Sequence, residues 1–312
     1  MGSGTVLFDF DNDGDLDIYL LQGALLGEKT TLEDSIYPPD QIPRDQLFRN
    51  DLTTDEEGNA HVSFVNVTES SGIDARGYGM GAAVSDFNHD GWLDLYVMKS
   101  GPPGGAQRHN ELFINNGPPS ENETAGFTPT FTEQAKAYGI ADEGLSVHGA
   151  FFDYDLDGDL DLYLLNNSLR SVGGYDLIPG QRNKPDPAGG NKLYRNDGDH
   201  FTNVTTEAGI YSSNIGFGLG VSVGDLNLDG WPDLFVSNDF FERDYIYLNN
   251  ADGTFREVLE QCVKETSMGS MGADIADLNN DAWPDIFVTE MLPPDDRRIK
   301  TKTKFEDCII NS

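Results

Sequence analysis

The stretch that decides the fold is FDFDNDGDLDIYL, from Phe8 to Leu20, in which every second residue from Asp9 to Asp17 is an aspartate. Carboxylates crowded so closely repel one another, so the arrangement requires something that offsets their charge. The same plan recurs four times, in copies that begin at Asp86, Asp153, Asp225 and Asp277. The segment is therefore the centre of an internal repeat.

The composition describes a folded and strongly acidic protein. The 312 residues include 54 acidic and 20 basic side chains, which gives a formal net charge of -34. This charge excludes nucleic acid as a partner, because phosphate binding needs a basic patch. Aromatic residues make up 11% of the chain and there are 35 glycines, so the chain is not a disordered acidic tail. Its length is sufficient for a sizeable buried core.

Membrane and redox signals are few. We expect no membrane span, because no run of about 18 apolar residues is present. Met1 leads directly into a repeat, and we therefore expect any secretion signal to be missing from this chain. The chain has two cysteines, Cys262 and Cys308. A disulfide between them and two separate thiols both remain open.

Each repeat carries the signals of four short strands. A glycine-rich segment such as GYGMGAAV (residues 77–84) precedes the acidic loop, and an apolar strand such as LDLYVM (residues 93–98) follows it. After a variable insertion come two further strands, for example in NELFINNG (residues 110–117) and FTEQAKAYGI (residues 131–140). The strands are rich in β-branched and aromatic residues and are separated by turn residues. Apolar residues at the helical spacing of a helical solenoid are scarce.

Four antiparallel strands in each unit are typical of a β-propeller blade, in which neighbouring units cover one another's faces. We therefore predict an all-β fold, a single propeller domain over residues 1–312 with about 4.5 blades of this kind. The predicted blades are residues 1–76, 77–144, 145–213, 214–266 and, in part, 267–312.

The acidic loops follow the pattern D-x-[DN]-x-D-G-x-x-D, which places oxygen atoms at alternate positions of a tight turn. Glycine at position 6 permits the bend. Hard oxygen ligands in this number suit Ca²⁺, which takes about 6–8 of them, better than Mg²⁺, which requires stricter octahedral geometry. The predicted side-chain ligands are Asp9, Asp11, Asp13 and Asp17; Asp86, Asn88, Asp90 and Asp94; Asp153, Asp155, Asp157 and Asp161; Asp225, Asn227, Asp229 and Asp233; and Asp277, Asn279, Asp281 and Asp285. The backbone carbonyls at position 7 belong to Asp15, Trp92, Asp159, Trp231 and Trp283.

Two other interpretations of these loops are an EF-hand and a metal-free hairpin. An EF-hand needs a bidentate glutamate at position 12 and flanking helices. Position 12 is apolar in all five loops, where it is Leu20, Val97, Leu164, Val236 and Val288. The EF-hand and dockerin-like interpretations therefore fail, and the aspartate at position 9 closes the site from within the next strand. A metal-free, solvated hairpin is disfavoured because all five copies keep Asp or Asn at positions 1, 3, 5 and 9.

The fifth loop departs from the pattern at one position. Ala282 replaces the glycine at position 6, which disfavours a positive φ there. We therefore expect about five calcium sites, of which the fifth binds most weakly.

The segments GYGMGAAVSDFNHDGWLDLYV (residues 77–97) and GFGLGVSVGDLNLDGWPDLFV (residues 216–236) resemble FG-GAP/VCBS repeats. NKLYRNDGDHFTNVTTEAGI (residues 191–210) and MGADIADLNNDAWPDIFVTEMLP (residues 271–293) are similar to the cartilage-acidic-protein and UnbV type. This resemblance implies calcium-binding blades like those of the integrin α-subunit propeller. It also implies an adhesion or ligand-binding scaffold located outside the cell, on the cell surface or in the periplasm.

Propellers of this family usually have seven blades. The resemblance therefore implies that this chain is a fragment of a larger propeller. Its open blade edges would pair with missing blades or with another chain.

The predicted ligand-binding face lies opposite the metal loops. In a four-stranded blade, the connections between first and second strands lie on one face and those between second and third strands on the other. The long insertions at residues 23–45, 99–111 and 167–191 belong to the second kind, and long loops on a rigid scaffold usually carry function. We expect them to bind a polysaccharide or a protein, with packing of the loops alone as the other possibility. The same face is predicted to include Tyr78, His148, Phe217 and Met268.

Two functions remain open from the sequence. The first is a non-enzymatic, calcium-stabilised binding or adhesion scaffold. The second is an enzyme on the same scaffold, such as a polysaccharide lyase or hydrolase that acts in the central funnel. The sequence shows no Ser-His-Asp set, zinc-type cluster or phosphate-binding loop, which favours the first.

Overall fold

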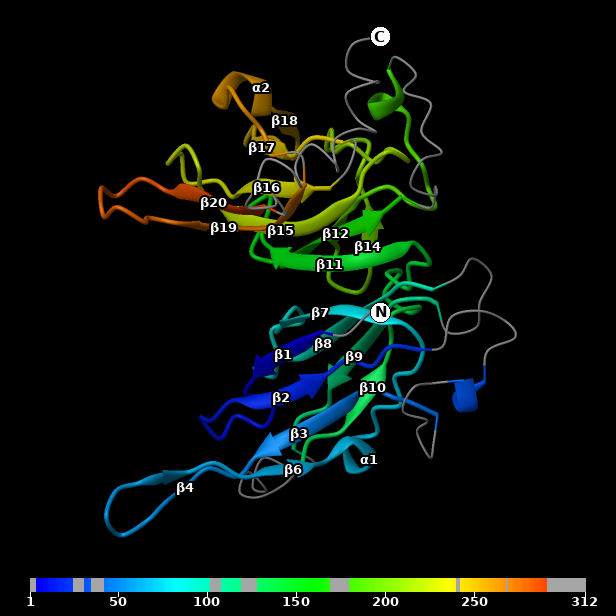
Figure 1. Ribbon diagram of the computed structural model, residues 1–312, viewed down its shortest axis with the longest axis vertical. Coiled ribbons are helices and arrows are strands. Elements are labelled where there is room, and N and C mark those ends of the chain that lie inside the picture. Colours follow the sequence, from blue (N-terminus) through cyan, green and yellow to red (C-terminus); the bar gives the residue numbers. More distant parts are fainter. Residues whose placement is uncertain are drawn as a thin grey trace, which may run out of the picture.

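The computed structural model describes residues 4–24, 31–34, 42–101, 108–118, 128–168, 180–239, 242–267 and 269–290. These residues form four antiparallel sheets of four strands each, followed by a two-stranded hairpin (Figure 1). The predicted all-β fold is confirmed. The helical segments in this part of the chain are short: α1 (Thr68–Ser71), α2 (Leu259–Cys262) and the 3-10 turns η1 (Leu32–Asp34) and η2 (Gln181–Asn183).

Each four-stranded sheet is a meander whose strands pair in chain order. The first contains β1 (Thr5–Phe8), β2 (Asp17–Leu20), β3 (Gln46–Asn50) and β6 (Phe64–Asn66). The second contains β7 (Gly79–Ser85), β8 (Asp94–Lys99), β9 (Glu111–Asn115) and β10 (Phe131–Glu133). The third contains β11 (Leu145–Phe152), β12 (Asp161–Asn167), β13 (Lys192–Asn196) and β14 (Phe201–Asn203). The fourth contains β15 (Gly218–Gly224), β16 (Asp233–Asn238), β17 (Tyr245–Asn249) and β18 (Phe255–Glu257), and the last hairpin contains β19 (Ser270–Ala276) and β20 (Asp285–Glu290).

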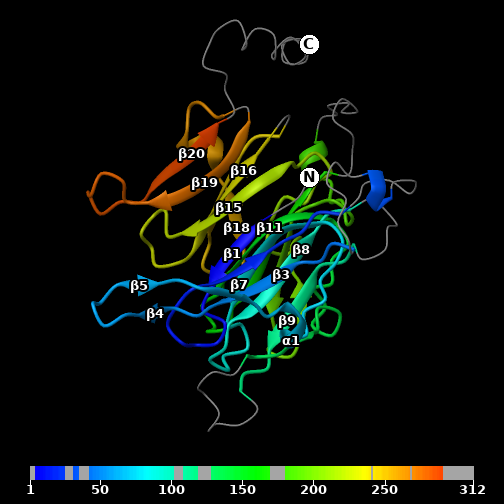
Figure 2. The same cartoon turned by 60° about the horizontal axis from the view of Figure 1, so that its bottom comes forward.

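One hairpin lies outside this repeating plan. It is formed by β4 (Thr53–Thr54) and β5 (Ala60–His61), within the connection between β3 and β6. Figure 2 shows it extending away from the sheets as an exposed arm. The sequence analysis did not predict this hairpin.

The first strands of consecutive sheets lie next to one another. β7 contacts β1 on one side and β11 on the other, and β15 contacts both β11 and β19 (Figure 1). Glycine makes this approach possible, because a Cβ atom added to Gly81 in β7 would lie 2.3 Å from the carbonyl oxygen of Val147 in β11. The glycine-rich segments of the repeats are therefore the places where neighbouring sheets meet most closely.

The hydrophobic core is divided among the spaces between consecutive sheets. The first sheet packs against the second, where the rings of Phe10 and Phe131 are 6.2 Å apart. The second sheet packs against the third. The third packs against the fourth, where the rings of Tyr154 and Phe255 are 6.0 Å apart. Because each internal sheet buries both of its faces between its neighbours, the unit of stability is the sheet pair rather than the isolated sheet.

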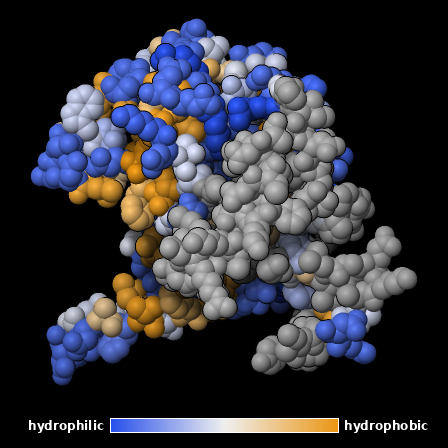
Figure 3. Space-filling view, turned by 45° about the horizontal axis from the view of Figure 1, so that its top comes forward, coloured by the Kyte–Doolittle hydropathy of each residue, from blue (hydrophilic) through white to orange (hydrophobic). Residues whose placement is uncertain are grey.

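The two end sheets leave apolar side chains exposed. Phe64 and Val65 in β6 are 44% and 41% exposed, and Met271 and Phe287 in the last hairpin are 40% and 57% exposed. Figure 3 shows apolar surface on both sides of the hollow between the last hairpin and the first sheet. These outward faces lack the cover that every internal sheet receives.

Candidate metal centres

Each acidic loop has a fixed backbone shape held by the aspartate at position 1. The carboxylate of Asp9 accepts hydrogen bonds from the backbone N–H groups of Asp13 and Gly14, at 3.1 and 3.0 Å. The turn requires positive φ angles, 57° at Asn12 and 94° at Gly14. The same pair of bonds is made by Asp86, Asp153, Asp225 and Asp277. The alternate oxygen positions predicted from the sequence therefore arise from one repeated turn.

The aspartate at position 9 is buried and ties the loop to the sheet. Asp17 begins β2 and is fully buried. Its Oδ2 accepts the N–H of Phe10 at 3.0 Å, and its Oδ1 accepts the N–H of Asn50 at the end of β3 at 2.8 Å. Each carboxylate oxygen has a second lone pair, which stays available for a cation. Asp94, Asp161 and Asp233 are buried in the same way and accept from Asn115, Asn196 and Asn249.

These asparagines are functional residues that the sequence analysis missed. The Nδ2 group of Asn115 donates to the carbonyl oxygen of Phe10 in the preceding loop at 2.9 Å, and Asn249 donates likewise to Tyr154 at 2.7 Å. In the second, third and fourth sheets, the asparagine at the end of the third strand therefore holds the acidic loop of the sheet before it. The recurrent Asn in RND, NNG and NNAD was the available signal.

The donor set of two loops can be tested for fit to a cation directly. Oxygens of Asp9, Asp11 and Asp17 can all lie within 4.8 Å of one another, and the same is true of Asp153, Asp155 and Asp161. In each set one buried oxygen, Oδ1 of Asp11 or of Asp155, has no hydrogen-bond partner in the part of the chain that the structure describes. An unpartnered buried carboxylate oxygen is costly unless a cation or a proton satisfies it. The residues present therefore fit a hard divalent cation.

Burial and crowding disfavour the charged form of these carboxylates. Burial raises the pKa of Asp17 to about 7, and raises the pKa values of Asp94 and Asp161 to about 7 as well. The pKa of Asp11 is raised to about 6, first by burial and then by the charges of Asp13 and Asp9. A divalent cation reverses this preference because it favours the deprotonated form of every carboxylate around it.

The fifth loop adopts the same turn in more exposed surroundings. Ala282 takes a φ of 69° where the other loops have glycine. Asp285 accepts the N–H of Leu278 at 3.1 Å, but it is only partly buried. Leu278 and Trp283 are 62% and 58% exposed. The backbone N–H of Ala282 lowers the pKa of Asp277. Weaker binding by this loop stays a prediction.

The opposite ends of the sheets are fastened by a second set of polar residues. Asp45 accepts the N–H of Gln22 at 2.7 Å and the hydroxyl of Tyr19 at 2.8 Å. The residues preceding β9, β13 and β17 accept backbone N–H groups in the same manner; they are Asn110, Asn191 and Asp244. Strands two and three of each four-stranded sheet are thus tied at both ends.

Buried ion pairs gather at this same end. Lys99 pairs with Glu111 at 2.5 Å, and both side chains are largely buried. Lys192 pairs with buried Asp142. Arg182 pairs with Glu242 at 2.6 Å. Buried pairs of this kind contribute geometric definition more than net stability.

The predicted ligand-face residues do not occupy equivalent positions. Tyr78 and Phe217 precede the first residues of β7 and β15, and Tyr78 is buried. His148 lies inside β11 opposite Leu165, beyond a register shift. Its buried Nδ1 atom has no hydrogen-bond partner among the described residues, and burial lowers its pKa. Met268 lies outside the described residues.

Two further sequence predictions fall partly outside the described residues. The insertions at 23–45, 99–111 and 167–191 are described only in part. Cys262 is exposed in α2, whereas Cys308 lies outside the described residues. Its pairing with Cys262 stays untested.

Sheets of this kind, each with an acidic turn between its first two strands, define a repeat protein with repeated candidate cation sites. An FG-GAP-like repeat model matches residues 180–236 and 225–288. Residues 180–288 therefore match FG-GAP-like repeats, and the resemblance seen in the sequence motifs is confirmed at this level.

Curated relatives point the same way. The chain is 44% identical to human integrin alpha-7 over 84 residues, which is 23% of this chain and 7% of that protein. It is 33% identical to human integrin alpha-6 over 82 residues, covering 23% and 7%. It is 33% identical to mouse integrin alpha-3 over 94 residues, covering 27% and 8%. The chain thus spans less than a tenth of the length of these relatives.

Among solved structures, the chain is similar to an Agrocybe aegerita lectin described as recognising non-reducing terminal N-acetylglucosamine. The TM-score is 0.44 at 15% identity, over 91% of this chain and 60% of that chain. A likeness at this level carries no argument about function. No helix in the described ranges is long and apolar enough to cross a membrane.

Proposed function

We propose that this chain is a calcium-stabilised, non-enzymatic binding scaffold that acts outside the cytosol. The observation that carries the proposal is the repeated closing aspartate: Asp17, Asp94, Asp161 and Asp233 are each buried beside further acidic or amide side chains. Four such buried carboxylates are difficult to maintain near neutral pH without a compensating cation. All-oxygen donor sets favour Ca²⁺ among the common divalent ions.

Calcium has a structural role in this proposal. The cation would be held by Asp9, Asp11, Asp13 and Asp17 in the first loop, with the carbonyl of Asp15, and by the corresponding residues of the other loops. When bound, it supplies positive charge that offsets the mutual repulsion of the carboxylates. Because Asp17 also accepts a bond from β3, neutralising the loop stabilises the pairing of three strands.

The sheets themselves act as propeller blades in this proposal. Support comes from the sequential meanders, the adjacent first strands and the apolar cores between neighbouring sheets. The exposed apolar side chains on the first and last sheets would then be covered by further blades or by another chain. A seven-bladed propeller accommodates both end faces.

The ligand would bind on the face opposite the metal loops. On that face the insertions begin at the ends of the second strands. Ion pairs and hydrogen-bonded Asp and Asn side chains lie at these strand ends. Long loops on a rigid scaffold suit recognition of a polysaccharide or protein surface. Extracellular calcium modules bind at about 10⁻⁴–10⁻³ M, which places the working protein where calcium is abundant.

Calcium titration of the chelated protein tests the proposal, with bound ions counted by calorimetry and thermal melting followed in parallel. We expect several ions per chain and a melting temperature that rises with calcium and much less with equal magnesium. At about 100 times Kd each site adds roughly 2.7 kcal/mol to the unfolding free energy. Melting that is indifferent to chelator would refute the proposal.

A further inference from the structure

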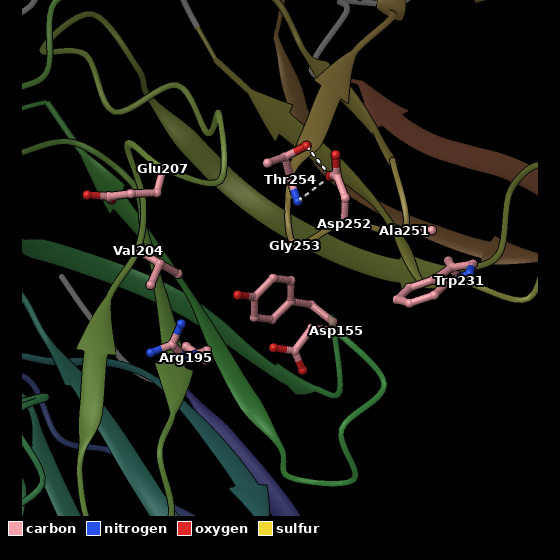
Figure 4. A pocket seen from close by; sticks show the side chains of 10 residues that line it. Asp155, Arg195, Val204, Glu207, Trp231, Ala251, Asp252, Gly253 and Thr254 are labelled. Carbon is pink, nitrogen blue, oxygen red and sulfur yellow. Dashed lines mark hydrogen bonds between the residues drawn. The ribbon is translucent and has the colours of Figure 1, made fainter.

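A cavity of about 440 Å³ opens between the third and fourth sheets, on the side of the metal loops. Figure 4 shows Trp231 at one end of it and Arg195 and Glu207 at the other, with Asp155 below the turn at residues 251–254. This is not the face on which the proposed ligand would bind. The lining residues are Tyr154, Asp155, Arg195, Val204, Glu207, Trp231 and the turn Ala251, Asp252, Gly253 and Thr254.

The space between the first and second sheets is built from the same residue types. The loop pattern aligns Asp11 with Asp155 and Trp92 with Trp231. The third strands also correspond, because QLFRND and KLYRND each place an arginine just before an asparagine–aspartate pair. Further equivalent pairs are Phe10 and Tyr154, Arg49 and Arg195, and Val67 and Val204.

Between the first two sheets, the equivalent arginine and tryptophan are contacted by other residues of the chain. Nη1 of Arg49 donates to the hydroxyl of Thr128 at 3.1 Å. Gly117 lies against the indole of Trp92, so closely that an added Cβ atom would be 2.8 Å from Nε1. In this arrangement the guanidinium therefore binds a hydroxyl oxygen, and the indole packs against a flat, uncharged group.

Between the third and fourth sheets, the corresponding connection is shorter. In the sequence, residues 251–253 correspond to residues 117–129 of the second sheet. Ala251 takes the position of Gly117 with nearly the same φ, 60° against 59°. Nothing corresponds to Thr128: among the described residues, Arg195 is bonded through its Nε to Asp197, just as Arg49 is to Asp51. The Arg195 side chain is 40% exposed.

We infer that this cavity binds a neutral sugar ring. A hydroxyl of the sugar binds Arg195 as the Thr128 hydroxyl binds Arg49. The apolar face of the sugar ring packs on the indole of Trp231 as Gly117 packs on the indole of Trp92. Carboxylates of Asp155, Glu207 and Asp252 accept further hydroxyl donors. The charge of Glu207 and Asp252 disfavours sulfated or carboxylated sugars, since the one arginine is already paired with Asp197.

The test is saturation-transfer NMR on the whole chain in excess calcium, which keeps the third loop in one state. The probes are a panel of neutral hexose and N-acetylhexosamine oligosaccharides, and the strongest is then titrated by calorimetry. We expect at least one to bind and Trp231→Ala to weaken it at least tenfold, about 1.4 kcal/mol. Calcium stoichiometry is measured in the same variant, so that a loss of sugar binding can be told apart from a change at the adjoining cation loop. Phe64→Ala, another half-exposed aromatic on a distant strand, is the control and should bind normally.

A second variant supplies the glycine and the threonine hydroxyl from the protein itself, in place of the sugar. Replacing residues 251–253 with residues 117–129 should abolish sugar binding while leaving melting and calcium stoichiometry unchanged. The inference is overturned if no neutral sugar gives a signal or if Trp231→Ala binds sugar like the parent. It is also overturned if a lysine-rich peptide binds at the site and no neutral sugar does. Calcium stoichiometry, measured in every variant, separates this outcome from failure of the proposed scaffold function.

Discussion

The side chain of Asn249 donates a 2.7 Å hydrogen bond to the backbone carbonyl of Tyr154, a residue 95 positions earlier in the chain. The same asparagine offers its own N–H to Asp233 at 2.8 Å. One residue therefore joins the closing carboxylate of its own metal loop to the loop of the preceding sheet. The four third strands end in this asparagine, and in three of them it reaches back across a sheet boundary.

Replacing Asn249 by alanine should destabilise the protein well beyond the loss of one surface bond. The change leaves the buried carbonyl of Tyr154 without this donor, which costs about 1–3 kcal/mol. Chemical denaturation with and without calcium measures the loss. Asn250→Ala is the matched control, because Asn250 is exposed and its side chain donates to Thr254 within the same turn. Equal losses in both variants would show that the inter-sheet bond is unimportant.

Asp11→Asn should change stability in opposite directions with and without calcium. In the chelated protein it removes a buried charge that Asp9 and Asp13 repel, so we expect melting to rise by about 2–4 °C for each kcal/mol relieved. In excess calcium it removes a charged ligand, so the increase in melting temperature caused by calcium should shrink. Asp74→Asn, at an exposed aspartate paired with Arg76, should shift melting little in either condition. A fall in both conditions would contradict a cation site at this loop.

The pH dependence of stability should invert when calcium is added. Asp17, Asp94 and Asp161 have folded-state pKa values of about 7 against an ordinary value of 3.8. In the chelated protein the folded state therefore holds more protons than the unfolded state, and the resulting stability is full below pH 3.8 and lost as pH rises through about 7. Calcium binds the deprotonated carboxylates, so its stabilising effect should grow over the same range. Melting curves between about pH 5 and 7.5, with calcium and with chelator, measure both slopes.

Ala282→Gly should strengthen the fifth loop. Ala282 adopts a φ of 69°, which glycine accepts at lower cost, by roughly 0.5–1 kcal/mol. We expect a higher melting temperature in calcium and tighter binding by the weakest class of sites. The reverse change, Gly158→Ala, imposes a φ of 101° on alanine in the third loop and should lower both quantities. No change in either variant would mean that this position does not limit binding.

Much of the repeating plan could be predicted from the sequence. The acidic turn, the apolar strand after it and the absence of a glutamate at position 12 depend on residues close together in the chain. Local patterns of this kind encode local structure. The all-β prediction and the family resemblance were accordingly confirmed.

What the sequence did not predict depends on contacts between sheets. The partner of Asn115 is Phe10, over a hundred residues away, and it emerges only once consecutive sheets are packed. His148 follows a register shift in β11 that also occurs in β7, β15 and β19, where a glycine stands at the corresponding position. The cavity beside Trp231 likewise follows from the length of one turn relative to its counterpart in another sheet.

Because these asparagines donate to loops earlier in the chain, the loops acquire their hydrogen bonds in a fixed order during synthesis. The loop beginning at Asp9 leaves the ribosome long before Asn115, yet its Phe10 carbonyl receives its side-chain donor only from Asn115. Each loop is therefore completed by a segment translated about one repeat later. Since chains fold from the amino terminus as they emerge, we expect every new sheet to stabilise the one before it. A stalled nascent chain would then carry, at its growing end, one acidic loop that lacks its asparagine donor.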